Sequence, residues 1–254
     1  MLYHSLLEFQ TFAEHTNCVN SIEFSPFSGD QYLCSVSDDE IIRLCDIETS
    51  NPLNIFNEHN NVVCCVTFSP LQANNNNNDN SDETIRIWDI EKAKRLIVFK
   101  EHDDWVACVK YGSNELLNTI LSGSHDKSVR LWDIRSGQQV QVFNGHKDYV
   151  KAVEYSPFVI KNSIDNSNVI CSGSFDNTIL FWDIRSHKKE LHVIKEDDVI
   201  LCFKFLKLNR QKEDANNTKN DYSFNLCCSF KKNQSYLGII YIFKKNHFSN
   251  LFSI

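Results

Sequence analysis

Ser122–Asp133 reads SGSHDKSVRLWD, and the predicted architecture of the chain follows from this segment. Ser172–Asp183 reads SGSFDNTILFWD and keeps the same order of small, acidic, apolar and Trp-Asp positions. In both segments, apolar residues on either side of a short polar turn predict two antiparallel strands. A motif that recurs in this way indicates an internal repeat, which has to be recognised before individual residues are interpreted.

Weaker copies of the motif lie earlier in the chain. An aspartate precedes the tryptophan by six residues in both segments above, and Asp82 stands six residues before Trp88. Asp39 stands six residues before Cys45, which takes the place of the tryptophan. A histidine also recurs at intervals of 43 or 44 residues, at His15, His59, His102 and His146. The chain therefore contains four repeats of this length.

Each repeat carries material for four short strands. Behind each histidine comes an apolar run with a period of two, which predicts a half-buried strand. These runs are Val19–Phe24, Val63–Phe68, Val106–Tyr111 and Val150–Tyr155. Strands two and three flank the polar turn. A fourth strand is expected before the next histidine, at Leu53–Phe56, Arg95–Phe99 and Gln139–Phe143.

This order, with a histidine before strand one and Trp-Asp after strand three, resembles the WD-repeat (WD40) family. The resemblance implies an all-β WD40 β-propeller formed by a single domain, residues 1–254, with one blade per repeat. Clear repeats cover about residues 5–194, and a degenerate fifth repeat covers about residues 195–254. About five blades are expected, whereas a seven-bladed ring needs about 300 residues. Three interpretations stay open: a five-bladed or open, incomplete propeller, a piece of a longer protein, or a ring completed by a second chain.

The resemblance also implies a hydrogen-bonded chain inside each blade, made of the histidine, a strand-two serine, the turn aspartate and the tryptophan. A buried imidazole needs partners on both nitrogens, and the turn carboxylate supplies one. The serine is Ser122 or Ser124 in the third repeat and Ser172 or Ser174 in the fourth. The residues assigned to these chains are His15, Asp39, His59, Asp82, Trp88, His102, Ser124, Asp126, Trp132, His146, Ser174, Asp176 and Trp182. Their expected role is structural rather than catalytic.

Three repeats depart from the pattern. Cys45 removes the indole donor from the first repeat. In the second repeat, Asn74–Asn80 reads NNNNNDN, and asparagine is depleted in strands, so a weak or missing second strand is expected. The fourth repeat is longer than the third, and its extra residues fall in Val159–Asn168, which is expected to be a polar loop.

The fifth repeat is degenerate, with Glu196 in the position of the histidine. Leu201–Phe205 is expected to form strand one, and Asn209–Asp221 a polar loop without core-forming residues. Strands two and three are expected at Phe224–Phe230 and Leu237–Phe243. The strand expected at Leu6–Phe12 belongs to the last blade in the family's closure scheme, where pairing with this third strand would close the ring.

The composition of the chain limits its class. Its 254 residues are 42% hydrophobic and 23% charged, and the net charge of -7 argues against direct binding of nucleic acid, which favours a basic excess. No apolar run is long enough to cross a membrane, and Met1–Asn20 lacks the basic start of a signal peptide. Most of the ten cysteines lie in apolar runs, where a free thiol behaves as a small buried hydrophobe. These features predict an intracellular protein, cytoplasmic or nuclear, in a reducing compartment.

The sequence carries no motif for catalysis or for a cofactor. It lacks G-x-x-x-x-G-K, G-x-S-x-G and H-E-x-x-H. The pairs Cys64-Cys65 and Cys227-Cys228 are adjacent, and neighbouring side chains on a strand point to opposite faces, which disfavours a zinc site. No enzymatic activity, cofactor or metal is therefore expected.

The expected function is a non-enzymatic scaffold that binds partner proteins or peptides on its loop face, within a multiprotein complex. By their place in the repeat, Trp105 and Tyr149 stand at the start of strand one, and His125 and Phe175 stand just before the turn aspartate. Exposed aromatic residues on rigid loops are typical interface anchors. Trp105, Tyr149 and Phe175 are the first candidates, and self-association is expected if the ring is incomplete.

Two alternative functions stay open. Trp132–Arg135 and Trp182–Arg185 both read WDIR, which resembles the box by which some propellers dock, as substrate receptors, on the adaptor of a cullin-type ubiquitin ligase. Arg135 and Arg185 would make that contact. The second alternative is a scaffold subunit of an RNA-processing complex, since members of the family have this role. The acidic charge of this chain does not support it.

Overall fold

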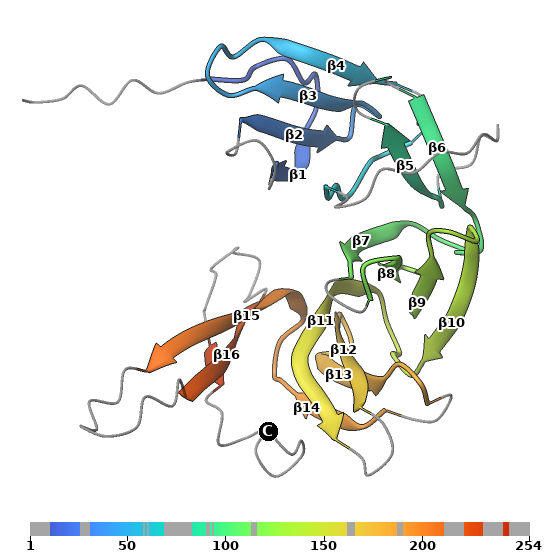
Figure 1. Cartoon of the computed structure of the whole chain (residues 1–254), viewed down its shortest axis with the longest axis vertical. Coiled ribbons are helices and arrows are strands. Elements are labelled where there is room, and N and C mark those ends of the chain that lie inside the picture. Colours follow the sequence, from blue (N-terminus) through green and yellow to red (C-terminus); the bar gives the residue numbers. More distant parts are fainter. Residues whose placement is uncertain are drawn as a thin grey trace, which may run out of the picture.

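The computed structural model of the chain describes residues 11–25, 31–57, 59, 61–68, 83–89, 92, 94–112, 116–161, 166–186, 190–210, 221–230 and 241–243. The strands β1–β17 are arranged in five antiparallel sheets (Figure 1). The prediction of an all-β fold is confirmed.

The sheets follow one another in the order of the chain, and we number them 1 to 5. Sheet 1 contains β1 (Val19–Phe24), β2 (Tyr32–Ser37), β3 (Ile42–Asp46) and β4 (Pro52–Phe56). Sheet 2 contains β5 (Ile85–Asp89) and β6 (Lys94–Phe99). Sheet 3 contains β7 (Val106–Tyr111), β8 (Thr119–Ser124), β9 (Ser128–Asp133) and β10 (Gln138–Asn144). Sheet 4 contains β11 (Val150–Lys161), β12 (Asn166–Ser174), β13 (Thr178–Asp183) and β14 (His192–Lys195). Sheet 5 contains β15 (Ile200–Arg210), β16 (Asp221–Phe230) and β17 (Tyr241–Phe243).

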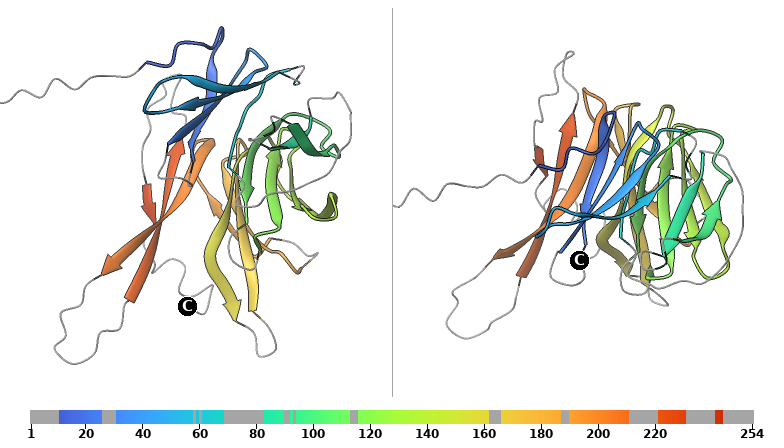
Figure 2. Two further views of the ribbon diagram at one scale, coloured as in Figure 1. Left: turned by 45° about the horizontal axis from the view of Figure 1, so that its top comes forward. Right: turned by 90° about the horizontal axis from the view of Figure 1, so that it is seen from above.

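The five sheets lie along an arc (Figure 1). β1 and β7 face the middle of the arc, whereas β4, β6 and β10 lie along its outside (Figure 1). Seen from above, the strands of successive sheets stand side by side (Figure 2). This stacking buries both faces of an inner sheet, so the strands at its centre lose the alternation of buried and exposed side chains that a one-sided sheet shows. β8 illustrates this, because all of its residues from Ile120 to Ser124 are buried.

Neighbouring sheets are joined by apolar clusters. The clusters include Val36, Leu44 and Trp88 between sheets 1 and 2, Phe99 and Trp132 between sheets 2 and 3, Leu131 and Trp182 between sheets 3 and 4, and Phe181 and Phe203 between sheets 4 and 5. The glycine of each Ser-Gly-Ser segment allows the close approach. A Cβ on Gly123 would lie 2.6 Å from Val150 Cγ1, and a Cβ on Gly173 would lie 2.6 Å from Ile200 Cγ2. Only a residue without a side chain fits there.

Sheet 1 differs from sheets 3 and 4 on the face that points away from sheet 2. Val19 and Ile22 of β1 are 50% and 54% exposed. Val150 and Val153 occupy the same places in β11, and they are 0% and 2% exposed because they pack on sheet 3. Among the described residues, no apolar cluster joins this face of sheet 1 to sheet 5.

Sheet 2 departs from expectation in its first strand. The structure assigns no strand to Val63–Phe68, so that prediction is wrong. Val63 N donates to the Ser37 carbonyl of sheet 1 at 3.3 Å, but the segment joins no ladder with another described strand. Asn74–Asn80, where a weak or missing second strand was expected, lies outside the described residues. The segment still contributes Val63, Val66 and Phe68 to the apolar cluster shared with sheet 1.

The polar loop expected at Val159–Asn168 is also wrong for most of its length. β11 and β12 continue as a long hairpin in which Val159 pairs with Asn168 and Lys161 pairs with Asn166. Pro157 does not end β11, because the pairing register shifts between Tyr155 and Val159. A proline is tolerated at such a bulge, where its missing N–H interrupts no regular ladder bond.

In sheet 5, β15 and β16 reach further into the expected loop than the sequence indicates. Arg210 pairs with Asp221 at the end of this hairpin, and residues 211–220 lie outside the described residues. Of the strand expected at Leu237–Phe243, the structure describes β17 alone. The strand expected at Leu6–Phe12 lies outside the described residues up to position 10, and Phe12 belongs to no strand.

Candidate functional site

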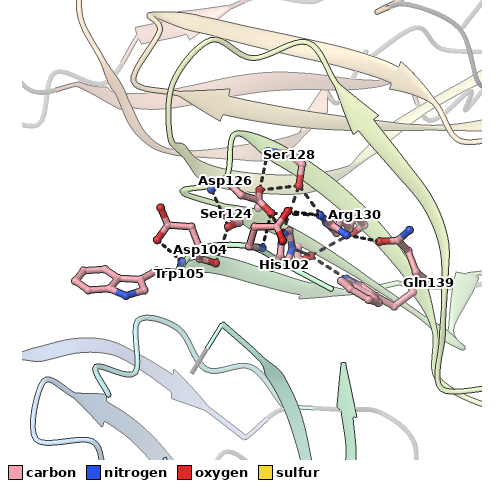
Figure 3. Close-up of polar contacts among 12 residues, drawn as sticks. His102, Asp104, Trp105, Ser124, Asp126, Ser128, Arg130 and Gln139 are labelled. Atoms are coloured by element: carbon pink, nitrogen blue, oxygen red, sulfur yellow. Dashed lines mark hydrogen bonds and ion pairs between the residues drawn. The ribbon is translucent and has the colours of Figure 1, made fainter. Parts of the chain in front are cut away.

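Sheet 3 contains a buried hydrogen-bonded chain that begins at its tryptophan (Figure 3). Trp132 Nε1 donates to Ser122 Oγ at 2.8 Å, and Ser122 Oγ lies 2.7 Å from His102 Nε2. On the other side of the ring, His102 Nδ1 lies 2.7 Å from Asp126 Oδ2. The donors and acceptors agree if the Ser122 hydroxyl donates to Nε2 and the Nδ1–H of His102 donates to the carboxylate.

Sheet 4 repeats this chain with its own residues. Trp182 Nε1 donates to Ser172 Oγ at 2.9 Å, and Ser172 Oγ lies 2.7 Å from His146 Nε2. His146 Nδ1 lies 3.0 Å from Asp176 Oδ2. The two indoles also contact the outer strand of the preceding sheet, since the centroid of Trp182 lies 5.6 Å from that of Phe143. Each hydrogen-bonded chain therefore links the strands and loops of one sheet. It also holds the indole that packs on the preceding sheet.

The assignment of Ser124 and Ser174 to these chains is wrong. Ser124 Oγ donates to the carbonyl of Asp104 at 2.9 Å and accepts from the Asp126 backbone N–H at 3.0 Å. Ser174 makes the equivalent bonds with Asp148 and Asp176. Ser124 and Ser174 stand at the end of strand two and connect the two loops at that end of the sheet. Ser122 and Ser172, two residues earlier, lie level with the histidine rings.

The turn between strands two and three places the aspartate. Its third residue is Lys127 in sheet 3 and Asn177 in sheet 4, with φ values of +69° and +64°. The N–H of Lys127 donates to the Ser124 carbonyl at 3.2 Å and closes the turn, and the left-handed conformation of Lys127 then leads the chain into β9. Burial opposes ionisation of Asp126 and Asp176. Hydrogen bonds from the histidine and from the hydroxyl two residues further on, Ser128 or Thr178, outweigh this effect and hold both pKa values well below the usual range.

Sheet 1 keeps part of the chain. His15 Nδ1 lies 2.9 Å from Asp39 Oδ2, and His15 Nε2 lies 2.8 Å from Ser35 Oγ. Cys45 is buried in the place of the tryptophan, so the indole donor is replaced by a small thiol. Burial opposes ionisation of Asp39, but hydrogen bonds from the Thr16 N–H and from His15 hold its pKa below the usual value.

Sheet 2 holds its histidine and tryptophan in a different environment. His59 and Trp88 have ring centroids 6.4 Å apart, and Trp88 also contacts Phe56 at 5.0 Å. Burial, with Arg86 and Arg95 nearby, lowers the pKa of His59 to about 3, so this imidazole is neutral. Trp88 Nε1 is buried without a hydrogen-bond partner among the residues that the structure describes. Asp82 lies outside them.

Sheet 5 replaces two members of the chain. Cys228 pairs with Phe203 as Ser172 pairs with Val153, so a thiol stands where sheet 4 has its serine. Burial, with Glu196 as the next largest cause, raises the pKa of Cys228 to about 12. The thiol therefore stays protonated beside Glu196, the residue in the histidine position.

The predicted partner-binding residues of sheets 3 and 4 form a continuous aromatic row. The ring of Trp105 lies 5.6 Å from that of His125, and His125 stacks on Tyr149 at 4.3 Å with an interplanar angle of 9°. Tyr149 then lies 6.1 Å from Phe175. Backbone bonds tie the loops, because His125 N donates to the Trp105 carbonyl at 2.9 Å and Phe175 N donates to the Tyr149 carbonyl at 3.0 Å. We call Trp105, His125, Tyr149 and Phe175 the aromatic row.

Sequence reasoning missed Lys151, which lies against the row. Its Nζ is 3.4 Å from His125 Nε2 and 5.9 Å from the centroid of Phe175. Burial, followed by Lys151, lowers the pKa of His125, while Asp104 and Asp148 oppose this shift. The spacing within one repeat carries no signal for these contacts, because His125 and Phe175 belong to two different sheets.

The family comparison agrees with this geometry. The family model of the WD domain, G-beta repeat (WD40), matches residues 8–46, 93–133 and 137–183, which together make up half of the chain. The chain belongs to the WD40 family. WD40 domains are in general protein-interaction scaffolds rather than catalysts. No curated protein matches the chain as a relative.

The WD40 motif places Arg135 and Arg185 at the end of strand three, away from the aromatic row at its start. Both side chains are exposed. Asp133 holds the first of these turns by accepting from Ser136 N at 2.7 Å, and Asp183 accepts from Arg185 N at 2.9 Å. The two arginines thus occupy equivalent places in neighbouring WD40 sheets.

The described part of this WD40 chain contains no group of three or more His, Cys, Asp or Glu side chains that could hold a metal ion. Within the same residues, no helix has the length and apolarity needed to span a membrane.

Proposed function

We propose that this protein is an interaction scaffold that binds partner proteins or peptides on the loop face that carries the aromatic row. The observation behind this proposal is the row itself, in which four rings from two sheets follow one another at centroid distances of 4.3 to 6.1 Å. Trp105 and Tyr149 are 41% and 39% exposed, so each presents a ring to solvent while its backbone is fixed by hydrogen bonds.

Rings held in this way are suited to binding. A partner that covers them buries apolar area and orders few rotatable bonds, because the backbone bonds and the stacking already fix the loops. Tryptophan and tyrosine are also the residues that most often dominate interface energies. The row therefore supports a role as the anchor of an interface.

The test compares partners recovered by the wild-type chain with those recovered by a Trp105→Ala/Tyr149→Ala variant. We expect the variant to lose its specific partners in quantitative pull-down mass spectrometry, while its melting temperature changes little because both rings are half exposed. Phe24→Ala, which removes a 52% exposed ring of sheet 1, is the matched control and should keep them. Identical partners for the double variant and the wild type would place the binding face elsewhere.

We further propose that the five sheets are the blades of one open propeller domain. The apolar clusters between successive sheets support this proposal, because each joins neighbours as in a radial stack. The exposed face of sheet 1 supports the open form.

A second candidate function rests on Arg135 and Arg185. Both side chains are exposed at equivalent ends of sheets 3 and 4, as docking on a ubiquitin-ligase adaptor would require. If this function holds, a cullin adaptor should copurify with the wild-type chain and be lost with Arg135→Ala/Arg185→Ala. Equal recovery with both chains, or none with either, would remove this candidate.

A further inference from the structure

A carboxylate directly precedes each exposed ring of the aromatic row, Asp104 before Trp105 and Asp148 before Tyr149. Asp104 Oδ1 accepts from the backbone N–H of Trp105 at 2.7 Å, and Asp148 Oδ1 accepts from that of Tyr149 at 2.8 Å. Each bond uses one oxygen of the carboxylate. These bonds give each carboxylate a structural task, which alone would explain its presence.

The same bond is made without a charge in sheets 1 and 2. Asn17 Oδ1 accepts from the N–H of Cys18 at 2.8 Å, and Asn61 Oδ1 accepts from that of Val62 at 2.9 Å. An amide oxygen therefore accepts this backbone N–H bond equally well. The negative charges of Asp104 and Asp148 are not needed for it. In these two sheets the charged residue precedes an aromatic residue, Trp105 or Tyr149, whereas the amides precede Cys18 and Val62.

The surroundings of the aromatic row already hold one cation. Lys151 lies with its Nζ 5.9 Å from the centroid of Phe175 and 3.4 Å from His125 Nε2. This amine lies against the rings of His125 and Phe175, the second and fourth members of the row. At the other end, Trp105 is 41% exposed and projects away from the hydrogen-bonded network of sheet 3 (Figure 3). Asp104 lies beside it, and the adjacent Asp103 side chain is 90% exposed.

We propose that the Trp105 end of the aromatic row binds an arginine side chain of a basic peptide segment, with the guanidinium over the indole and paired with Asp104. This inference rests on the proposed function and names the chemistry of its partner. Tryptophan is the best aromatic partner for a cation, and the planar guanidinium both stacks on rings and pairs with both oxygens of a carboxylate. Asp148, one loop further along the row, adds a second negative charge near His125, the ring next to Trp105.

Charge complementarity favours a basic over an acidic segment. A carboxylate brought to the Trp105 end would approach the carboxylate of Asp104, and like charges at short range repel. The net charge of -7 adds a longer-range attraction for a basic partner that weakens with added salt.

The test measures binding of labelled peptides by fluorescence anisotropy. The probes share a Gly/Ser host sequence and carry two adjacent arginines, lysines, citrullines or glutamates. We expect the arginine peptide to bind tightest, the lysine peptide several-fold more weakly, and the citrulline and glutamate peptides not measurably. Citrulline keeps the shape of arginine without its charge, so equal binding of the citrulline peptide, tighter binding of the glutamate peptide, or no measurable binding of the arginine peptide would overturn the proposal.

The decisive variant is Asp104→Asn/Asp148→Asn, which keeps the backbone bonds in the form seen at Asn17 and Asn61. It should weaken binding of the arginine peptide by about tenfold or more and reduce its salt dependence. The control is Asp46→Asn/Asp89→Asn, which changes the net charge equally at turns after strand three and should leave the affinity unchanged. Both aspartates there accept backbone N–H bonds, from Thr49 and Lys92, that an asparagine can keep.

The indole is tested separately. Trp105→Leu keeps apolar area but loses the aromatic face and should weaken binding of the arginine peptide, whereas Trp105→Tyr should keep most of it. If Trp105→Ala/Tyr149→Ala loses its partners while Asp104→Asn/Asp148→Asn binds the arginine peptide like the wild type, the proposed function stands and this inference fails. If neither variant differs from the wild type, both fail.

Discussion

At the scale of single residues, Asp126 connects three parts of sheet 3. Its carboxylate accepts from His102 Nδ1 at 2.7 Å, from the backbone N–H of Ser128 at 2.9 Å and from that of Asp103 at 3.2 Å. The loop before β7, the turn after β8 and the start of β9 therefore meet on one side chain (Figure 3). The side chain of Asp103, by contrast, is 90% exposed and lies 3.8 Å from Arg130.

These contacts predict very different costs for alanine substitutions of Asp126 and Asp103, which lie in two loops at the same end of sheet 3. Asp126→Ala should lower the free energy of unfolding by at least about 2 kcal/mol, because buried His102 and two N–H groups lose their partner. Asp103→Ala should change it by less than about 0.5 kcal/mol, because exposed ion pairs contribute little. Urea unfolding followed by circular dichroism measures both. Equal midpoints would contradict a structural role for the hydrogen-bonded chain.

The sequence identified His102, Asp126 and Trp132 as members of this chain, because the repeat fixes their spacing. It left the serine open between Ser122 and Ser124, and the assigned Ser124 is the wrong one. Ser122 and Ser124 are two residues apart on one strand, so both point to the same face. Which of them meets His102 Nε2 depends on how far along the strand the ring lies, and that distance is set by the fold of the loop rather than by the period.

At the scale of elements, the alternation of apolar residues predicted most strands but not their ends. In sheet 4, strand one was expected at Val150–Tyr155, yet β11 runs on through Pro157 to Lys161 beyond a shift in register. A proline ends a strand only where its N–H would have entered the ladder, and the sequence alone does not say which N–H groups do. The length of β11 therefore follows from its pairing with β12 in the structure and not from the sequence.

Contacts between elements of different repeats were also beyond the sequence. His125 belongs to the turn after β8 and Tyr149 to the loop before β11, and their stacking at 4.3 Å crosses from sheet 3 to sheet 4. Spacing within one repeat indicates which residues reach the loop face but not which of them touch a neighbouring sheet. Lys151 was missed for the same reason, since its partners His125 and Phe175 lie on two sheets.

At the scale of the whole molecule, the sheets form a nearly one-dimensional stack. In such a stack each unit is stabilised mainly by its neighbours, so the two end units depend on one interface each. Sheets 3 and 4 pack on a neighbour at both faces. Sheet 1 shares a cluster with sheet 2 and exposes Val19, Ile22 and Phe24 on its other face.

One matched pair of substitutions tests whether that face is free in solution. Val19 and Val150 hold the same place in β1 and β11, opposite Ser37 and Ser174, but they are 50% and 0% exposed. Val150→Ala should cost about 2 kcal/mol in the free energy of unfolding, from two lost methyl groups and the cavity they leave, and Val19→Ala less than about 0.5 kcal/mol. Equal costs would mean that the face of sheet 1 is covered. Sedimentation of the wild-type chain would then separate closure onto sheet 5, which leaves a monomer, from pairing with a second copy, which depends on concentration.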